Sequence, residues 1–78
     1  MNVELECYAK LAKSGRCNFM EPTPYKLKAG QTVADLVRQA NLPHQDIEFV
    51  SVNNSIANTD TVLLDGDRVG LVPVFGGG

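Results

Sequence analysis

Apolar and polar residues alternate along the first eleven positions of the chain. One row of alternate positions is apolar and comprises Val3, Leu5, Cys7, Ala9 and Leu11. The other row is mostly polar and comprises Asn2, Glu4, Glu6, Tyr8 and Lys10. Alternation with period two indicates a half-buried strand, so we expect residues 2–11 to form one. Cys7 lies in the apolar row and is interpreted as a small core residue.

A turn is predicted at residues 13–16, where Gly15 can adopt a positive φ. The next segment contains Pro22 and Pro24. Because proline has no amide hydrogen to donate, this segment is expected to be an edge strand or an irregular stretch. Residues 25–28 alternate again and form its clearer strand part.

One amphipathic helix is predicted to begin after Thr32. Thr32 is a plausible N-cap, and Asp35 three residues later can complete a capping box. A single apolar stripe follows at helical spacing and comprises Val33, Leu36, Val37 and Ala40. Pro43 cannot continue a helix, so the helix is expected to end near residue 41.

The second half of the chain predicts strands at residues 47–52 and 55–57, joined by a tight turn at Asn53 and Asn54. Residues 44–46 are expected to be a loop, and residues 62–64 a short apolar segment. A turn at residues 65–67 precedes the apolar run 68–75, the best candidate for a buried central strand. We therefore expect an α+β fold, with one main helix on one face of a mixed sheet of four to five strands.

Composition narrows the functional classes. A chain of 78 residues forms one small domain and has no room for a deep active site, so a stand-alone enzyme is not expected. A formal net charge of −2 argues against a nucleic-acid binder. Two cysteines are too few for a disulfide framework or a four-thiolate cluster. No apolar run could cross a membrane, and the first residues do not resemble a signal peptide. A reduced, soluble, cytoplasmic protein without a metal site is expected.

Four short motifs together resemble the β-grasp, or ubiquitin-like, family, and within it the bacterial sulfur carriers. They lie at residues 29–36, 50–53 and 64–69 and in the three terminal glycines, so the resemblance covers essentially the whole chain. It implies a β-grasp domain at residues 1–75 and a flexible glycine tail at residues 76–78. The family includes the small subunit of molybdopterin synthase and the carrier that supplies sulfur to the thiamin thiazole.

The resemblance implies that the terminal glycine is the reactive group. Gly78 would be adenylated by a ubiquitin-activating-type enzyme that uses ATP, and would then become a thiocarboxylate that donates sulfur. Gly77 and Gly76 would precede it in the tail. Residues without Cβ atoms can thread a narrow channel in a partner, which agrees with this role. Such a carrier binds no cofactor itself and is a protein cosubstrate; its partners would be the activating enzyme, a sulfur donor and a sulfur-accepting enzyme.

Pro73, Val74 and Phe75 lie directly before the glycines. They either end the last strand against the core or serve as an apolar anchor for a partner, since aromatic residues are enriched at interface hot spots. Residues 72–75 resemble the molybdopterin carriers, whose large-subunit partner would accept the tail. The sequence between the first strand and the helix, including residues 18–24, is longer than thiamin carriers usually allow. Cys17 is expected to be an exposed thiol near the first turn, for which a redox role is the minor interpretation.

Three alternatives remain open at this point. The chain could carry sulfur for thiamin or for another acceptor, such as a tRNA. It could be a protein modifier whose Gly78 is joined to a target lysine, because the activation chemistry is the same. It could also be a β-grasp interaction module with no chemistry at its tail.

Overall fold

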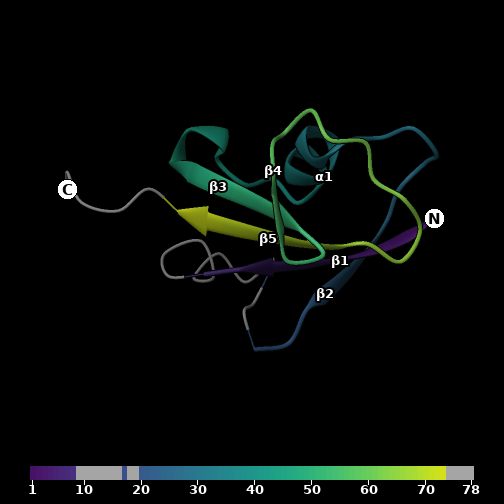
Figure 1. Ribbon diagram of the computed structural model, residues 1–78, viewed down its shortest axis with the longest axis horizontal. Coiled ribbons are helices and arrows are strands. Elements are labelled where there is room, and N and C mark those ends of the chain that lie inside the picture. Colours follow the sequence, from purple (N-terminus) through teal and green to yellow (C-terminus); the bar gives the residue numbers. More distant parts are fainter. Residues whose placement is uncertain (9–16, 18–19, 74–78) are drawn as a thin grey trace.

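The computed structural model describes residues 1–8, 17 and 20–73 (Figure 1). Its strands are β1 (Asn2–Cys7), β2 (Thr23–Lys26), β3 (Ile47–Val52), β4 (Ser55–Ala57) and β5 (Arg68–Pro73). Its helices are α1 (Val33–Gln39) and a short 3-10 helix at His44–Asp46. These elements give the α+β class that the sequence predicts.

The five strands form one mixed sheet in the order β2-β1-β5-β3-β4. The two central strands, β1 and β5, run parallel, with Leu5 opposite Val69 and Cys7 opposite Leu71. All other pairs are antiparallel. The apolar run predicted to be the central strand therefore lies between the first strand and β3, with hydrogen-bonded neighbours on both sides.

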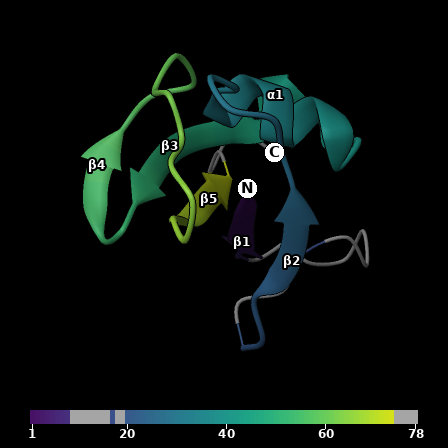
Figure 2. The same cartoon turned by 90° about the vertical axis from the view of Figure 1, so that its right-hand side faces the viewer.

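Helix α1 covers one face of the sheet (Figure 2). The core between them is built from alternate strand residues and the apolar stripe of the helix. Its members include Val3, Leu5, Val50, Val69 and Leu71 from the strands and Val33, Leu36, Val37 and Ala40 from the helical segment. Burial of the predicted stripe is confirmed at all four positions. Hydrophobic burial of this kind supplies the main stabilising free energy of a small domain.

The predicted capping box at the start of α1 is also confirmed. The backbone N–H of Asp35 donates to Thr32 Oγ1 at 3.3 Å, and the Thr32 N–H donates to Asp35 Oδ2 at 2.9 Å. These bonds satisfy amide groups that have no partner inside the helix. The predicted Asn53–Asn54 turn adopts φ values of 53° and 68°, in the left-handed region that asparagine tolerates.

Several predicted boundaries differ from the structure. β1 ends at Cys7, and residues 9–11 of the predicted strand lie outside the described residues. β2 begins at Thr23 and includes Pro24, because an edge strand needs donors on one side only. Residues 44–46 form a 3-10 helix where a loop was expected. Residues 62–64 belong to no named strand: Val62 forms an isolated bridge with Thr32, and Leu63 is buried in the core.

The prediction of free thiols is wrong. Cys7 and Cys17 form a disulfide whose Cα atoms lie 5.6 Å apart. Cys7 is buried as expected, but Cys17 exposes only 2% of its surface and is not the exposed residue that the turn suggested. Composition did not predict the bond because two cysteines are too few for a framework, whereas one pair is enough for a single crosslink.

Within the described residues, no helix has the length and apolar character needed to span a membrane.

Candidate functional site

The face of the sheet opposite α1 carries a mixed set of side chains, which we call the open face. Because side chains alternate along each strand, the neighbours of core residues point to this side. From β1, β5, β3 and β4 in turn, these residues are Glu4, Glu6, Arg68, Gly70, Val72, Phe49, Ser51 and Ile56. The face opposite the helix is partly open to solvent, since the side chains of Phe49 and Ile56 are exposed.

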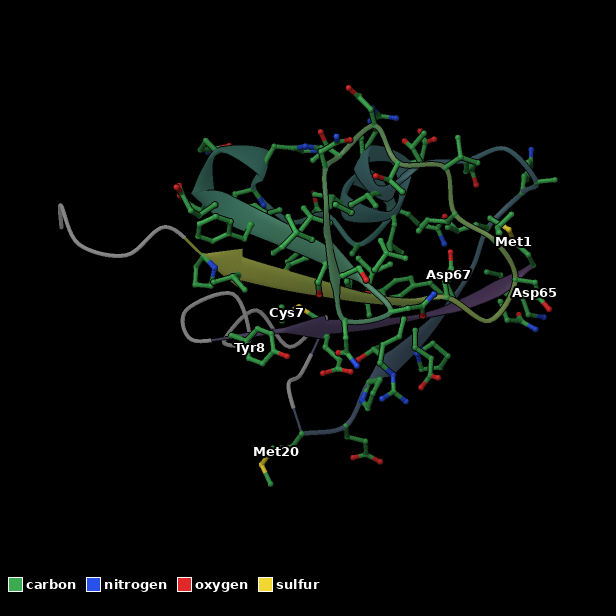
Figure 3. All side chains as sticks on the ribbon, in the orientation of Figure 1. Met1, Cys7, Tyr8, Met20, Asp65 and Asp67 are labelled. Carbon is green, nitrogen blue, oxygen red and sulfur yellow. A yellow bond between two sulfur atoms is a disulfide. The ribbon has the colours of Figure 1, made fainter. Side chains whose placement is uncertain are left out.

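The open face has an apolar region where β1 and β5 end. We define the open-face patch as Tyr8, Phe49, Gly70 and Val72. Phe49 lies opposite Val72 in the β3–β5 pair and exposes 52% of its surface. Tyr8 exposes 38%, and its backbone N–H donates to the carbonyl of Leu71 at 3.2 Å. Figure 3 shows Cys7 and Tyr8 together at this end of β1.

Gly70 lies in the middle of the patch, at a point where its backbone closely approaches Ser51. An ideal Cβ atom placed on Gly70 would lie 2.6 Å from Ser51 Oγ and 3.9 Å from Cε2 of Tyr8. The space that a side chain would fill is therefore taken by the Ser51 hydroxyl, and the Tyr8 ring lies next to it. A glycine inside a strand often marks such a close approach.

Charged side chains border the patch on the side away from the end of β5. Arg68 Nη2 lies 3.7 Å from Glu4 Oε1, and Arg68 Nε lies 3.4 Å from Glu6 Oε1. The Arg68–Glu4 pair is about half exposed and contributes little stability, whereas the Glu6 side chain exposes only 16% of its surface. The Tyr8 hydroxyl donates to Glu6 Oε2 at 3.4 Å. Partial burial, together with the Glu6 charge, raises the pKa of Tyr8, so the ring stays a neutral phenol at physiological pH.

The predicted site residues fall almost entirely beyond the described part. Pro73 is the last residue of β5, lies opposite Ile47 and is almost completely buried. Its burial fits an anchor that holds the end of β5 better than a direct contact with a partner. Val74, Phe75, Gly76, Gly77 and Gly78 lie outside the described residues, and their roles stay predictions. The domain boundary at residue 75 is likewise a prediction.

Among the residues that the structure describes, no three His, Cys, Asp or Glu side chains gather as a metal site would require. The acidic residues of the predicted turn at 65–67 bind backbone amides instead. Asp65 Oδ1 accepts from the Asn2 N–H at 2.7 Å, and Asp67 Oδ2 accepts from the Leu64 N–H at 2.8 Å. They therefore fix the turn that leads into β5.

A comparison with protein-family models decides the family. The model described as the ThiS family matches residues 22–78, which is well over half of the chain and includes the terminal glycines. The chain belongs to the ThiS family. It is therefore a β-grasp protein of the sulfur-carrier or ubiquitin-like modifier kind, as the resemblance implied. The search of curated proteins found no match.

Solved structures similar to this ThiS-family chain share its fold at low sequence identity. SAMP1 from Haloferax volcanii is 20% identical, with a TM-score of 0.70 over 100% of both chains. A putative molybdopterin converting factor, subunit 1, from Pyrococcus furiosus is 21% identical, with a TM-score of 0.72 over 94% of this chain and 97% of that one. A second structure, of H. volcanii small archaeal modifier protein 1, is 17% identical, with a TM-score of 0.69 over 92% and 95%.

Sequence reasoning did not single out the open-face patch of this ThiS-family chain. Two signals could have found it. Tyr8 is an aromatic residue in an otherwise polar row of the first strand, and Gly70 interrupts an apolar run. Phe49 carried no local signal, because its position beside Val72 depends on the pairing of strands far apart in the sequence.

Proposed function

We propose that this chain is a sulfur carrier whose Gly78 carboxylate is activated by ATP and converted to a thiocarboxylate. In this scheme a carboxylate oxygen attacks the α-phosphate of ATP and releases pyrophosphate, which gives an acyl adenylate. A sulfide-level nucleophile then attacks the carbonyl carbon and expels AMP. The ATP and the catalytic groups belong to the activating partner, so the chain is a cosubstrate.

The observation that carries the proposal is the family match through residue 78, combined with the place of β5 in the fold. β5 is the central strand, and buried Pro73 holds its last position. The residues that would react follow directly after this anchor. A rigid element at the base of a tail limits the positions that its end can reach, which lowers the entropy lost on binding.

The open-face patch supports the same function because it offers a docking surface next to the end of β5. Ordering the tail in a partner costs on the order of 1–2 kcal/mol per residue. Contacts made by the folded domain must offset this cost. Phe49 and Tyr8 are partly exposed aromatic residues, the type that dominates protein interfaces. We therefore propose that the activating enzyme and the sulfur-accepting enzyme bind the patch in turn.

We place the sulfur acceptor in molybdopterin biosynthesis, with the large subunit of molybdopterin synthase as the accepting partner. The resemblance of residues 72–75 to the molybdopterin carriers favours it, and a putative molybdopterin converting factor subunit shares the fold over nearly the whole chain. The match to the ThiS family equally suits a carrier for thiamin. Sulfur transfer assayed with each purified acceptor enzyme distinguishes the two.

Intact-mass measurement tests the carrier chemistry. The protein is incubated with ATP, a sulfur donor and an activating enzyme that is competent on a known carrier. A mass gain equal to one oxygen replaced by one sulfur, located in the terminal peptide, is expected. A persulfide on a cysteine adds sulfur without removing oxygen, so its mass gain differs. No change under these conditions would contradict the proposal.

A variant without Gly77 and Gly78 is the matched control. It should keep the fold and lose the mass gain, because the sheet ends at Pro73. Sulfur transfer by this truncated chain would show that the reactive group is not Gly78.

A protein modifier is the second candidate, because two similar structures are of a small archaeal modifier protein that shares the fold. The adenylate would then be attacked by the amine of a target lysine, with release of AMP and formation of an amide. A ladder of conjugates in host extract, absent for the truncated chain, would favour this function.

A further inference from the structure

The disulfide lies at the end of the sheet that carries the open-face patch. Cys7 is the last residue of β1 and pairs with Leu71, two positions before the end of β5. Its partner Cys17 is bound there, with the two Cα atoms 5.6 Å apart. These are the only two cysteines of the chain. The bond therefore joins Cys17 to the end of β1, next to the last residues of β5.

One end of this bond is covalently next to the patch. Tyr8 follows Cys7 directly, donates its N–H to the Leu71 carbonyl and places its ring 3.9 Å from the Cβ position of Gly70. The position of the Tyr8 ring thus depends on how the chain leaves β1 at Cys7. The bond holds the chain on both sides of Tyr8, at residues 7 and 17.

We propose that the Cys7–Cys17 disulfide is a redox-controlled crosslink that holds Tyr8 over Gly70 and so sets the shape of the open-face patch. In the oxidised protein the Tyr8 ring lies against Gly70. In the reduced protein the ring moves away from Gly70. The consequence for partner binding rests on the proposed function, whereas the change in the patch does not.

The redox step needs only a dithiol. A dithiol attacks the Sγ–Sγ bond, which breaks, and the dithiol ends as its own disulfide. Its two electrons pass to the sulfurs of Cys7 and Cys17, and its two protons end on the new thiols. A disulfide oxidant such as glutathione disulfide reverses the step and is reduced to two thiols.

Burial of the two cysteines determines how fast this crosslink can be reduced. The two cysteines expose 0% and 2% of their surface. A reductant in solution therefore reaches the sulfurs only after this end of the domain opens. Brief exposure to a monothiol should leave the bond intact, and prolonged treatment with a dithiol should cut it.

The bond matters for Tyr8 because two of the hydrogen bonds of this residue are long. The N–H bond to Leu71 is at the long end of the usual range, and the hydroxyl contact with Glu6 is longer still, at 3.4 Å. Opening a crosslink releases conformational entropy in the segment that it closed. That gain competes with these two long hydrogen bonds of Tyr8.

Two-dimensional amide NMR spectra of the oxidised and dithiothreitol-reduced protein test the proposal without any partner. Reduction should shift the amide signals of Gly70 and Ser51 and the ring signals of Tyr8, while signals from α1 stay in place. Glutathione disulfide should restore the first spectrum. Unchanged Gly70 and Ser51 signals in protein shown by alkylation to be reduced would overturn the proposal. So would loss of the dispersed spectrum, because the bond would then be needed for folding.

The double variant C7A/C17A is the matched control. It should resemble the reduced protein and should not respond to dithiothreitol. A response of this variant to the reductant would show that the effect does not come from the pair.

A binding measurement with the activating enzyme completes the test. Reduction should weaken binding about fivefold, the loss expected when one interfacial aromatic contact worth ~1 kcal/mol is removed. Equal binding by the oxidised and reduced forms would overturn the claim that the crosslink affects binding of the activating enzyme. If neither form binds the activating enzyme or gains sulfur, the proposed function fails. The NMR result still decides whether the crosslink holds Tyr8 over Gly70.

Discussion

The side-chain amide of Asn53 donates a hydrogen bond to the carboxylate of Asp67, with 2.9 Å between Nδ2 and Oδ1. Asn53 closes the β3–β4 turn, and Asp67 closes the turn that leads into β5. The same amide accepts the Arg68 N–H through Oδ1 at 3.0 Å. One side chain thus joins two turns at the base of the central strand.

Replacement of Asn53 by alanine should lower the free energy of unfolding by about 2 kcal/mol. The two hydrogen bonds are lost, and alanine would have to adopt a φ of 53°. Asn53→Gly keeps this φ without strain and should cost less. Urea denaturation measures both values. Asn54→Gly, at a φ of 68° in the same exposed turn, is the control and should be nearly neutral. An alanine variant as stable as the parent would contradict this role of Asn53.

The close approach of Gly70 to Ser51 predicts a coupled pair of substitutions. Gly70→Ala should destabilise the domain by ~1–2 kcal/mol, because the new methyl group would meet Ser51 Oγ at 2.6 Å. Adding Ser51→Ala should recover most of that loss, which a double-mutant cycle in urea detects as a favourable coupling energy. Simple additivity of the two changes would mean that the Ser51 hydroxyl is not the obstacle.

Reduction of the disulfide should lower the free energy of unfolding by ~3 kcal/mol, the loop-entropy value for cysteines separated by about ten residues. The measurement is a pair of urea titrations with and without dithiothreitol. The variant C7A/C17A should give the same midpoint in both titrations. A midpoint that does not move for the parent protein would show that the crosslink adds no stability.

Acid should weaken the start of α1 through Asp35. The hydrogen bond from the Thr32 backbone N–H is the main cause that holds the pKa of Asp35 below its usual value; the Thr32 hydroxyl and Arg38 act in the same direction. A lowered folded-state pKa means that the stabilisation is complete above the unfolded-state pKa of ~4 and is lost as pH falls through the folded-state value. In urea titrations between about pH 2 and 6, the parent should lose more stability on acidification than Asp35→Asn. Parallel profiles for the two proteins would exclude this contribution.

Truncated chains test whether the fold depends on the residues that follow β5. A chain that ends at Pro73 keeps all the described strand pairs and should remain folded by circular dichroism. A chain that ends at Gly70 lacks Leu71, a fully buried residue that lies opposite both Cys7 and Val50, and should not fold. Unfolding of the longer truncated chain would show that residues 74–78 take part in the domain.

Local patterns account for the elements that were predicted well. The strand at residues 47–52, the Asn53–Asn54 turn and the helix start at Thr32 each depend on neighbours a few residues apart. Such neighbours are visible in a sequence as alternation, a capping pair or a turn pair. The family resemblance then implied the β-grasp fold, whereas the order of the strands was not predicted and comes from the structure.

Features that depend on distant pairing were missed. The disulfide requires that residue 17 returns to the end of β1, and the patch requires that Phe49 lies beside Val72. Neither relationship has a periodic signal. The reactive glycines were predicted from the sequence and the resemblance, and they remain a prediction because residues 74–78 lie outside the described part.

The position of β5 also has a consequence for the order of assembly. β1 is synthesised first, yet its parallel partner in the centre of the sheet is β5, at the other end of the chain. Until residues 68–73 have left the ribosome, β1 and β3 have no strand to join them, and their apolar sides remain open. Folding therefore waits for synthesis of β5, and a nascent chain arrested before residue 68 should stay accessible to protease and chaperones.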